Sequence, residues 1–182
     1  MNLNQSRVHT ILDLGCGTGV AGAGWALAQA DRPELIGVDQ HPWTVEETKW
    51  NWRTLGLNGR VRRGDLVKAY ARLRRTSRPH LSRGTAIVLA WAVNELGPDD
   101  RRTLLPLLLE HAREGASVLV IEPVARRAAP WWDEWAATFG EARGVVEEWP
   151  MGIKLEPPFD ELDRAAGFRR ESLSARSLCI RP

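Results

Sequence analysis

Glycines are concentrated in one short segment near the start of the chain, at Gly15, Gly17 and Gly19. Residues 8–14, just before them, are apolar and predict a buried strand, and the alanine-rich residues 20–30, just after them, predict a helix. Glycine lets a backbone turn sharply and approach a ligand closely, and the first turn of a helix has N–H groups without partners inside the helix. The segment therefore predicts the turn of a cofactor-binding site.

A carboxylate follows this turn at a distance that fits ribose binding. Residues 34–38 predict a second strand, and Asp39 ends it about 20 residues after the glycine segment. An acidic side chain at that place can accept hydrogen bonds from ribose hydroxyls. An ordinary turn followed by a capping aspartate is the alternative. The combination of Asp39 with the glycine segment favours the cofactor site.

The segment Asp13-Leu14-Gly15-Cys16-Gly17-Thr18-Gly19 resembles the first motif of class I S-adenosylmethionine-dependent methyltransferases. That family also has an acidic residue at the end of its second strand, matched by Asp39, and another after its third strand, matched by Gly64-Asp65-Leu66. The resemblance runs in order over about residues 8–122. Nicotinamide-dependent enzymes usually have the spacing G-x-G-x-x-G, so the glycine spacing found here disfavours a dehydrogenase.

The resemblance implies that S-adenosylmethionine is the cofactor. It places the methionine end at the glycine turn, the ribose at Asp39 and the adenine near Asp65, which could also cap the helix that follows it. The residues expected to bind the cofactor are Asp13, Gly15, Cys16, Gly17, Gly19, Asp39, Gln40, Asp65, Leu66, Ala90 and Trp91.

Polar residues follow the fourth and fifth predicted strands, where this fold places the transferred methyl group. Asn94 and Glu95 come after residues 85–90, and Glu122 comes directly after residues 116–121. Each is a candidate catalytic residue, since a carboxylate can take a proton from the methyl acceptor. For both glutamates, hydrogen bonding to loop N–H groups is the alternative. Enzymes of this fold that methylate amide or base nitrogens often have an Asn/Asp-Pro-Pro-aromatic motif here. Its absence from this sequence disfavours such acceptors.

The chain has nine tryptophans against one tyrosine and three phenylalanines. Trp91, Trp131 and Trp132 lie on segments expected to border the crevice, where an indole ring can stack against a planar substrate. Arg126 is a candidate partner for a substrate carboxylate or phosphate. Core packing, or a solvated loop for the arginine, is the alternative. Residues 144–158 contain three prolines and are expected to be irregular. The loop over 150–159 is expected to cover the site.

Strands and helices alternate along most of the chain, which predicts an α/β fold. The expected architecture is a single Rossmann-like doubly wound domain, a mostly parallel sheet with helices on both faces. Further helices are expected at 42–55, 65–75, 98–112, 130–139 and 159–166, and further strands at 59–63 and within 168–180. Because proline cannot donate a backbone hydrogen bond, we expect a kink or break at Pro106.

The chain has 182 residues, which suits one domain. We expect a cofactor-binding core over 1–122 and a substrate-side part over 123–182, with no separate N-terminal substrate domain. The hydrophobic share of 43% and charged share of 26% are typical of a soluble globular protein. Two distant cysteines fit no metal site, and neither a signal peptide nor a membrane-spanning run is evident. The expected location is the cytoplasm.

The formal net charge of +2 favours a small-molecule substrate over a nucleic acid, and no membrane partner is expected. A nucleic-acid partner stays open because of two basic stretches, formed by Arg60, Arg62 and Arg63 and by Arg72, Arg74, Arg75 and Arg78. The alternative function is a methyltransferase-like binding, ribosome-assembly or RNA-modifying protein on the same fold. The residues around Asn94-Glu95-Leu96 resemble a methyltransferase-like family linked to assembly of the mitochondrial small ribosomal subunit, whose cysteine cluster this sequence lacks.

Overall fold

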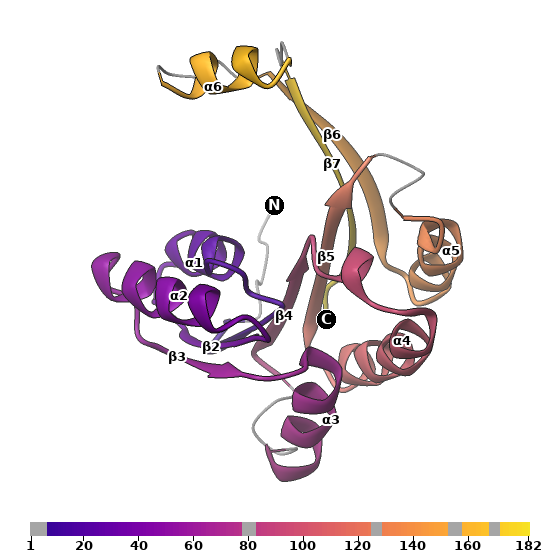
Figure 1. Cartoon of the computed structure of the whole chain (residues 1–182). Coiled ribbons are helices and arrows are strands. Elements are labelled where there is room, and N and C mark those ends of the chain that lie inside the picture. The colour runs from indigo at the N-terminus through magenta and orange to yellow at the C-terminus, as the bar shows by residue number, and fades with distance from the viewer. Residues whose placement is uncertain (1–6, 78–82, 125–128, 153–157, 168–171) are drawn as a thin grey trace.

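A seven-stranded sheet runs through the centre of the structure, a computed structural model that describes residues 7–77, 83–124, 129–152, 158–167 and 172–182. Figure 1 shows its arrangement. The strands are β1 (Thr10–Leu14), β2 (Glu34–Asp39), β3 (Gly59–Arg63), β4 (Thr85–Ala90), β5 (Ser117–Pro123), β6 (Val145–Gly152) and β7 (Ser172–Ile180). The helices are α1 (Val20–Leu27), α2 (Pro42–Thr54), α3 (Leu66–Ser77), α4 (Pro98–Arg113), α5 (Trp132–Glu141) and α6 (Phe159–Ala165), with a 3-10 turn η2 (Val93–Glu95).

The strand order is β3-β2-β1-β4-β5-β7-β6. The first five strands of that order are parallel to one another, and β7 lies antiparallel to both β5 and β6. The predicted mostly parallel α/β sheet is therefore confirmed. Dinucleotide-binding folds typically have the order 3-2-1-4-5-6, from which β7 is a departure. The order reverses at β1, between β2 and β4, and ligands of open α/β sheets bind at the carboxyl ends of the strands at such a point.

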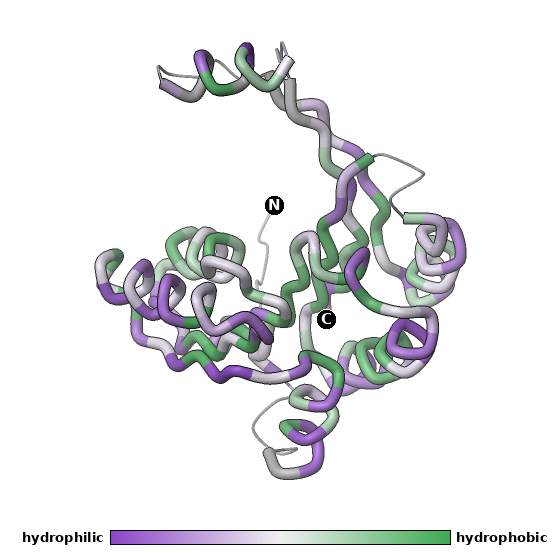
Figure 2. Tube along the Cα trace, viewed as in Figure 1, coloured by the Kyte–Doolittle hydropathy of each residue, from purple (hydrophilic) through white to green (hydrophobic). Residues whose placement is uncertain are grey.

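Helices cover both faces of the sheet, as expected. On one face α1 and α2 pack their buried residues, among them Ala26 and Trp52, against β1, β2 and β4. On the other face α3, α4 and α5 do so through residues that include Tyr70, Leu108 and Trp135 (Figure 1). The middle strands are hydrophobic and the edge strand β3 is largely hydrophilic (Figure 2), in line with its exposure.

Helix α4 continues through Pro106, so the expected break does not occur. Proline leaves the carbonyl four residues earlier, on Arg102, without its helical partner. Pro106 and Arg102 are both exposed, so water can replace that partner. Leu104 and Leu108 on the other side of the helix are fully buried and hold it against the sheet. None of the helices in the described ranges is long and apolar enough to cross a membrane.

The prediction of an irregular segment after residue 144 is wrong for residues 145–152, which form β6. This strand pairs antiparallel with β7, and Pro150 lies opposite Ser174. Strand β6 is the last in the sheet order, and proline is tolerated on an edge strand because one side needs no hydrogen bond. Residues 153–157 of the expected covering loop lie outside the described residues. Figure 1 shows the β6–β7 ladder extending away from the other strands, with α6 near its far end.

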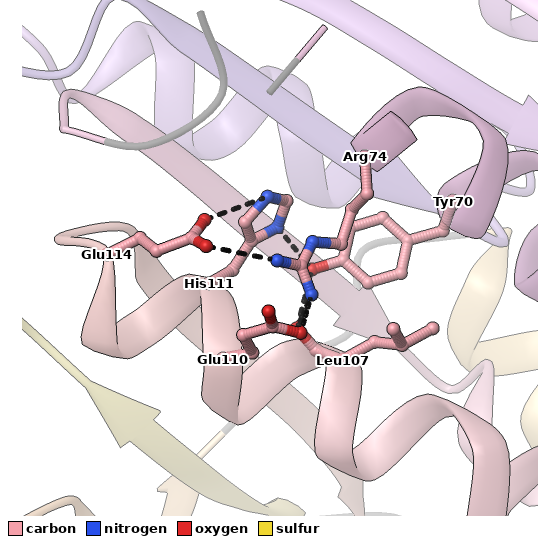
Figure 3. A network of polar contacts seen from close by, with 6 residues as sticks. All are labelled: Tyr70, Arg74, Leu107, Glu110, His111 and Glu114. Carbon is pink, nitrogen blue, oxygen red and sulfur yellow. Dashed lines mark hydrogen bonds and ion pairs between the residues drawn. The ribbon is translucent and has the colours of Figure 1, made fainter. Parts of the chain in front are cut away.

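A buried polar network joins α3 to α4 (Figure 3). The Tyr70 hydroxyl lies 2.6 Å from His111 Nδ1, and the Arg74 guanidinium pairs with Glu110 and, at 3.2 Å, with Glu114. Arg74 is only 6% exposed, so it is not part of a basic surface. The second basic stretch of the sequence is therefore not exposed as a whole. Arg72 and Arg75 are exposed, Arg74 is buried, and Arg78 lies outside the described residues.

Candidate functional site

The glycine segment forms a tight turn at the carboxyl ends of β1 and β2. Gly15, Gly17 and Gly19 have φ angles of +70°, +54° and +80°, which side chains other than hydrogen disfavour. The N–H groups of Gly15 and Cys16 both donate to the Val38 carbonyl, at 2.8 and 3.0 Å. The alternation of positive φ angles therefore explains why glycine occupies every second position of the turn.

One side of this turn is open. The N–H groups of Thr18, Val20 and Ala21 donate no hydrogen bond within the part of the chain that the structure describes. A Cβ atom built on Gly17 would meet nothing within 4 Å. A row of unpaired N–H groups beside open space can bind the carboxylate of an amino-acid group, so the turn fits the methionine end of S-adenosylmethionine.

Asp13 stands behind the turn rather than on its open side. Its side chain is 1% exposed, and Oδ2 accepts a 2.9 Å hydrogen bond from the N–H of Gly22 in α1. Burial raises the pKa of Asp13 to about 7. The structure thus gives this predicted cofactor residue a structural contact, which fixes the start of α1 beside the turn.

Asp39 lies at the end of β2, directly beside the turn. Its Oδ2 accepts the N–H of Gly17 at 2.9 Å, and its Oδ1 accepts the N–H of His41 at 2.9 Å and the hydroxyl of Thr44 at 2.7 Å. A carboxylate offers about four lone-pair directions, and three are used here. One direction remains, which would be available to a ribose hydroxyl.

The segments that follow β3 and β4 both approach the turn at Gly15. A Cβ built on Gly15 would lie 2.6 Å from Cβ of Ala92 and 3.3 Å from Cδ2 of Leu66. Asp65 caps α3, since its Oδ1 accepts the Lys68 N–H at 3.0 Å. The predicted methionine-end and adenine-end segments are therefore neighbours in space. Gln40, the remaining predicted adenine residue, is exposed at the end of β2.

Trp91 follows Ala90 at the carboxyl end of β4 and has an unusual backbone. Its φ angle is +54°, its side chain is 53% exposed, and its N–H donates to the Ile121 carbonyl at 2.9 Å. A bulky residue in the left-handed region is a conformational outlier. Such strain is commonly found at functional sites. The structure presents this indole to solvent at the edge where the crevice is expected.

Glu122 is fully buried beneath the loop that follows β4. Its Oε1 accepts the N–H groups of Val93 at 3.0 Å and of Asn94 at 3.3 Å. Its Oε2 and the Oδ1 of Asn94 are buried and have no hydrogen-bond partner among the described residues. Glu95, the third candidate catalytic residue, is exposed. The contacts of Glu122 agree with the loop-binding alternative, because they fix the position of Asn94.

The burial of Glu122 predicts a pH-dependent contribution to stability. Burial raises the pKa of this carboxyl to about 7, against 4.5 for an ordinary glutamate. The folded chain then retains a proton that the unfolded chain has released, so this group lowers the free energy of unfolding as the pH rises from about 4.5 to about 7. Glu122→Gln cannot titrate, and its amide oxygen can still accept both loop N–H groups.

We therefore expect the free energy of unfolding of Glu122→Gln, relative to the unmodified chain, to increase by about 1 to 3 kcal/mol between pH 5 and pH 7.5. Urea unfolding at a series of pH values measures this difference. Asp13 is present in both proteins, so its own titration cancels. A constant difference over this range would show that Glu122 is ionised throughout.

Two further predicted residues, both tryptophans, do not line the turn. Trp131 and Trp132 are 7% and 5% exposed and pack in the core beside Trp135, which agrees with the core-packing alternative. The Arg176 guanidinium lies 4.1 Å from the centre of the Trp132 ring. Arg126 lies outside the described residues.

The remaining predicted residue, Cys16, is buried in the turn with its sulfur 3.7 Å from the Thr48 hydroxyl. Burial raises the pKa of the thiol to about 12, so it is an unreactive packing group. Groups of His, Cys, Asp and Glu that could hold a metal ion do not occur among the described residues.

Sequence reasoning missed three residues of α2 that bind the backbone of the turn: Thr48, Asn51 and Trp52. Each donates a side-chain hydrogen bond to a carbonyl of the glycine segment. Their spacing in a helix places them on one face together with Thr44. The sequence does show a polar stripe on the helix after Asp39. A helix face that only contacts water gives the same pattern, so the stripe did not identify these contacts.

The family model of the methyltransferase small domain matches residues 1–74. A probable cobalt-precorrin-6B C(15)-methyltransferase (decarboxylating) from Pyrobaculum aerophilum is 34% identical over 77 residues. That match includes 41% of this chain and 39% of the relative, so the chain matches about two fifths of the relative's length.

Solved structures match almost the whole chain. The precorrin-6y C5,15-methyltransferase of Geobacter metallireducens has a TM-score of 0.57 and 8% identity, with 97% of this chain and 82% of that chain covered. A methyltransferase of Geobacter sulfurreducens in complex with S-adenosyl-L-homocysteine has a TM-score of 0.52 and 18% identity, with coverages of 99% and 87%. The chain has the class I methyltransferase fold. The resemblance seen in the sequence is thereby confirmed.

The class I methyltransferase fold also includes a structure described as a putative RNA methyltransferase from Pyrococcus horikoshii. It has a TM-score of 0.57 and 17% identity, with 97% of this chain and 76% of that chain covered. At such identities the likeness concerns the fold, which hosts acceptors of different chemical classes. The acceptor therefore has to be argued from the site itself.

Proposed function

We propose that this chain transfers a methyl group from S-adenosylmethionine to a small planar acceptor that lies against Trp91. The observation that carries the proposal is the meeting of three features at the carboxyl ends of β1, β2 and β4. These are a glycine turn with open N–H groups, the carboxylate of Asp39, and the exposed, strained Trp91. They lie where the strand order reverses, at the usual ligand site of this architecture.

Different residues of the site would contact different parts of the cofactor. The N–H groups of Thr18, Val20 and Ala21 are available to the methionine carboxylate, and Asp39 retains a lone pair for a ribose hydroxyl. Leu66 packs close to Gly15 and would contact the adenine end. Asp13 acts through its contact with α1 rather than on the cofactor.

Bound S-adenosylmethionine supplies a methyl group on a positively charged sulfur. The chain has to hold the acceptor in line with that methyl group and exclude water, and a covalent intermediate with the protein is not required. Glu122 fixes the N–H groups of Val93 and Asn94, so the loop beside Trp91 has one defined position. Glu95 on this loop is exposed and is the available carboxylate to take a proton from the acceptor.

A planar small molecule is favoured by the wall that Trp91 provides. The indole is 53% exposed, and an aromatic face binds planar or cationic groups. The curated relative is named as a methyltransferase for cobalt-precorrin-6B, a small-molecule substrate in that protein. The net charge of +2 also supports a small acceptor.

An RNA acceptor is the second candidate. Arg62 and Arg63 are exposed on the edge strand β3, and one structural neighbour is described as a putative RNA methyltransferase. We favour the small molecule because Arg74 is buried, which removes one cation from the basic surface that the sequence suggested. A screen of planar small molecules and RNA fragments with methyl-labelled donor distinguishes the two. Label on RNA alone would favour the second candidate.

Trp91 gives a test of the acceptor site. We expect Trp91→Ala to raise the KM for a small planar acceptor about tenfold, since stacking contributes on the order of 1 kcal/mol beyond the buried area. The Kd for S-adenosylmethionine should change less than about threefold. Trp91→Gly should show the same KM effect without backbone strain at φ +54°.

The matched control is Trp50→Ala, because Trp50 is also 53% exposed but lies on α2. It should leave both constants unchanged. An unchanged KM in both Trp91 variants would contradict the proposed acceptor site.

A further inference from the structure

Three side chains of α2 donate hydrogen bonds to three successive carbonyls of the glycine turn. Thr48 Oγ1 donates to Gly17 O at 2.6 Å, Asn51 Nδ2 to Thr18 O at 3.0 Å, and Trp52 Nε1 to Gly19 O at 2.8 Å. Thr48 and Trp52 are buried. The Gly19 carbonyl also accepts the N–H of Ala23 in α1, at 3.1 Å. Side chains of α2 therefore hold all three carbonyls, and α1 helps to hold the last of them.

The indole of Trp52 fits here because three glycines leave room for it. A Cβ built on Gly19 would lie 2.5 Å from its Nε1, one on Gly37 2.9 Å from its Cη2, and one on Gly59 2.6 Å from its Cε3. The ring is 2% exposed and therefore fills the space between the turn and strands β2 and β3. The Trp52 side chain thus packs the turn against the sheet, in addition to the hydrogen bonds from Gly15 and Cys16 to Val38.

These contacts determine where the open N–H groups point. A trans peptide unit is planar, so its N–H points opposite to its C=O. The C=O of Gly17 shares a peptide unit with the N–H of Thr18, and the C=O of Gly19 shares one with the N–H of Val20. Because both carbonyls point toward α2, both N–H groups point away from α2, to the side that is left without partners.

We propose that Thr48, Asn51 and Trp52 are positioning residues for the amino-acid end of the cofactor. By holding the carbonyls of the turn, they aim the N–H groups of Thr18 and Val20 at the cofactor carboxylate. The inference rests on the proposed binding of S-adenosylmethionine, and it concerns residues that touch the turn and not the cofactor.

The test uses variants that remove one donor each: Trp52→Phe, Asn51→Asp and Thr48→Val. Calorimetry well below the unfolding temperature should show a Kd for S-adenosylmethionine raised about three- to tenfold by each, the scale of one hydrogen bond. Thr48→Ser keeps the hydroxyl and should retain the original Kd. Trp50→Phe is the matched control, since Trp50 is 53% exposed on the same helix.

A second ligand separates positioning from general loosening of the fold. 5′-Methylthioadenosine has the adenosine part of the cofactor but lacks the amino-acid end. Its Kd should change less than about twofold in the same three variants, because it does not need the aimed N–H groups. Amide hydrogen exchange at Gly17 and Gly19 should become faster in Trp52→Phe and Asn51→Asp without any ligand, while Trp50→Phe should leave it unchanged.

The outcomes separate this inference from the proposed function. If the unmodified chain binds no S-adenosylmethionine, the proposed function fails. If amide exchange at Gly17 and Gly19 is also unchanged in Trp52→Phe and Asn51→Asp, the claim that α2 side chains hold the turn is overturned as well. If the unmodified chain binds the cofactor and the variants bind it equally well, the positioning role is overturned. Equal weakening for both ligands would also overturn it, because the effect would then not be specific to the amino-acid end.

Discussion

Gly19→Ala is expected to weaken S-adenosylmethionine binding about 30- to 700-fold. Alanine at φ +80° costs on the order of 1 kcal/mol. Its Cβ would lie 2.5 Å from Nε1 of the buried Trp52 and 2.6 Å from Cγ2 of the buried Thr48. Such overpacking adds about 1 to 3 kcal/mol, and each 1.4 kcal/mol is a factor of ten in affinity. The turn would have to move, and its N–H groups would move with it. Isothermal titration calorimetry measures the loss.

Gly24→Ala is the matched control in the following helix. Gly24 is exposed, and a Cβ built there meets nothing within 4 Å. This variant should keep the cofactor Kd and gain about 0.5 to 1 kcal/mol in stability, since alanine favours a helix. Binding by Gly19→Ala with the original affinity would show that the glycine turn does not form the cofactor site.

Asp39→Ala is expected to weaken cofactor binding about 10- to 100-fold, with the fold retained. The variant loses the acceptor for a ribose hydroxyl and leaves the Gly17 N–H without its 2.9 Å partner. Unpaired groups of this kind cost about 1 to 3 kcal/mol. Calorimetry with S-adenosylmethionine, together with circular dichroism for the fold, measures the effect.

Thr44→Val separates the cofactor role of Asp39 from its role at the start of α2. It removes the 2.7 Å hydrogen bond from the Thr44 hydroxyl and leaves the carboxylate in place. The cofactor Kd should then change less than about threefold. Equal losses in Asp39→Ala and Thr44→Val would indicate that Asp39 acts only through α2, and an unchanged Kd in Asp39→Ala would show that the ribose is held elsewhere.

The sequence predicts the strands and helices that position the cofactor because each has a local cause. The glycine turn requires positive φ angles, Pro42 begins α2, and the apolar Thr85–Ala90 becomes the buried strand β4. The neighbourhood of Gly15, Leu66 and Ala92 follows from the parallel order of these strands. These features depend on short segments, which sequence patterns describe well.

The features that could not be predicted depend on contacts between distant segments. Pro150 is a strand residue because β6 lies at the sheet edge, which the residues around it do not reveal. Arg74 looks like part of a basic face until Glu110 of α4 and Glu114, directly after α4, are placed beside it. Glu122 looks like a catalytic carboxylate, yet it accepts the N–H groups of Val93 and Asn94, which are 29 and 28 residues away in sequence.

The measurement that tests the central claim most directly is calorimetric titration of the full chain with S-adenosylmethionine, S-adenosylhomocysteine and NAD. The proposed site at Gly15–Gly19 and Asp39 predicts one-to-one binding of the first two ligands and no heat of binding with NAD. Binding of NAD without any response to S-adenosylmethionine would contradict the assignment of the site.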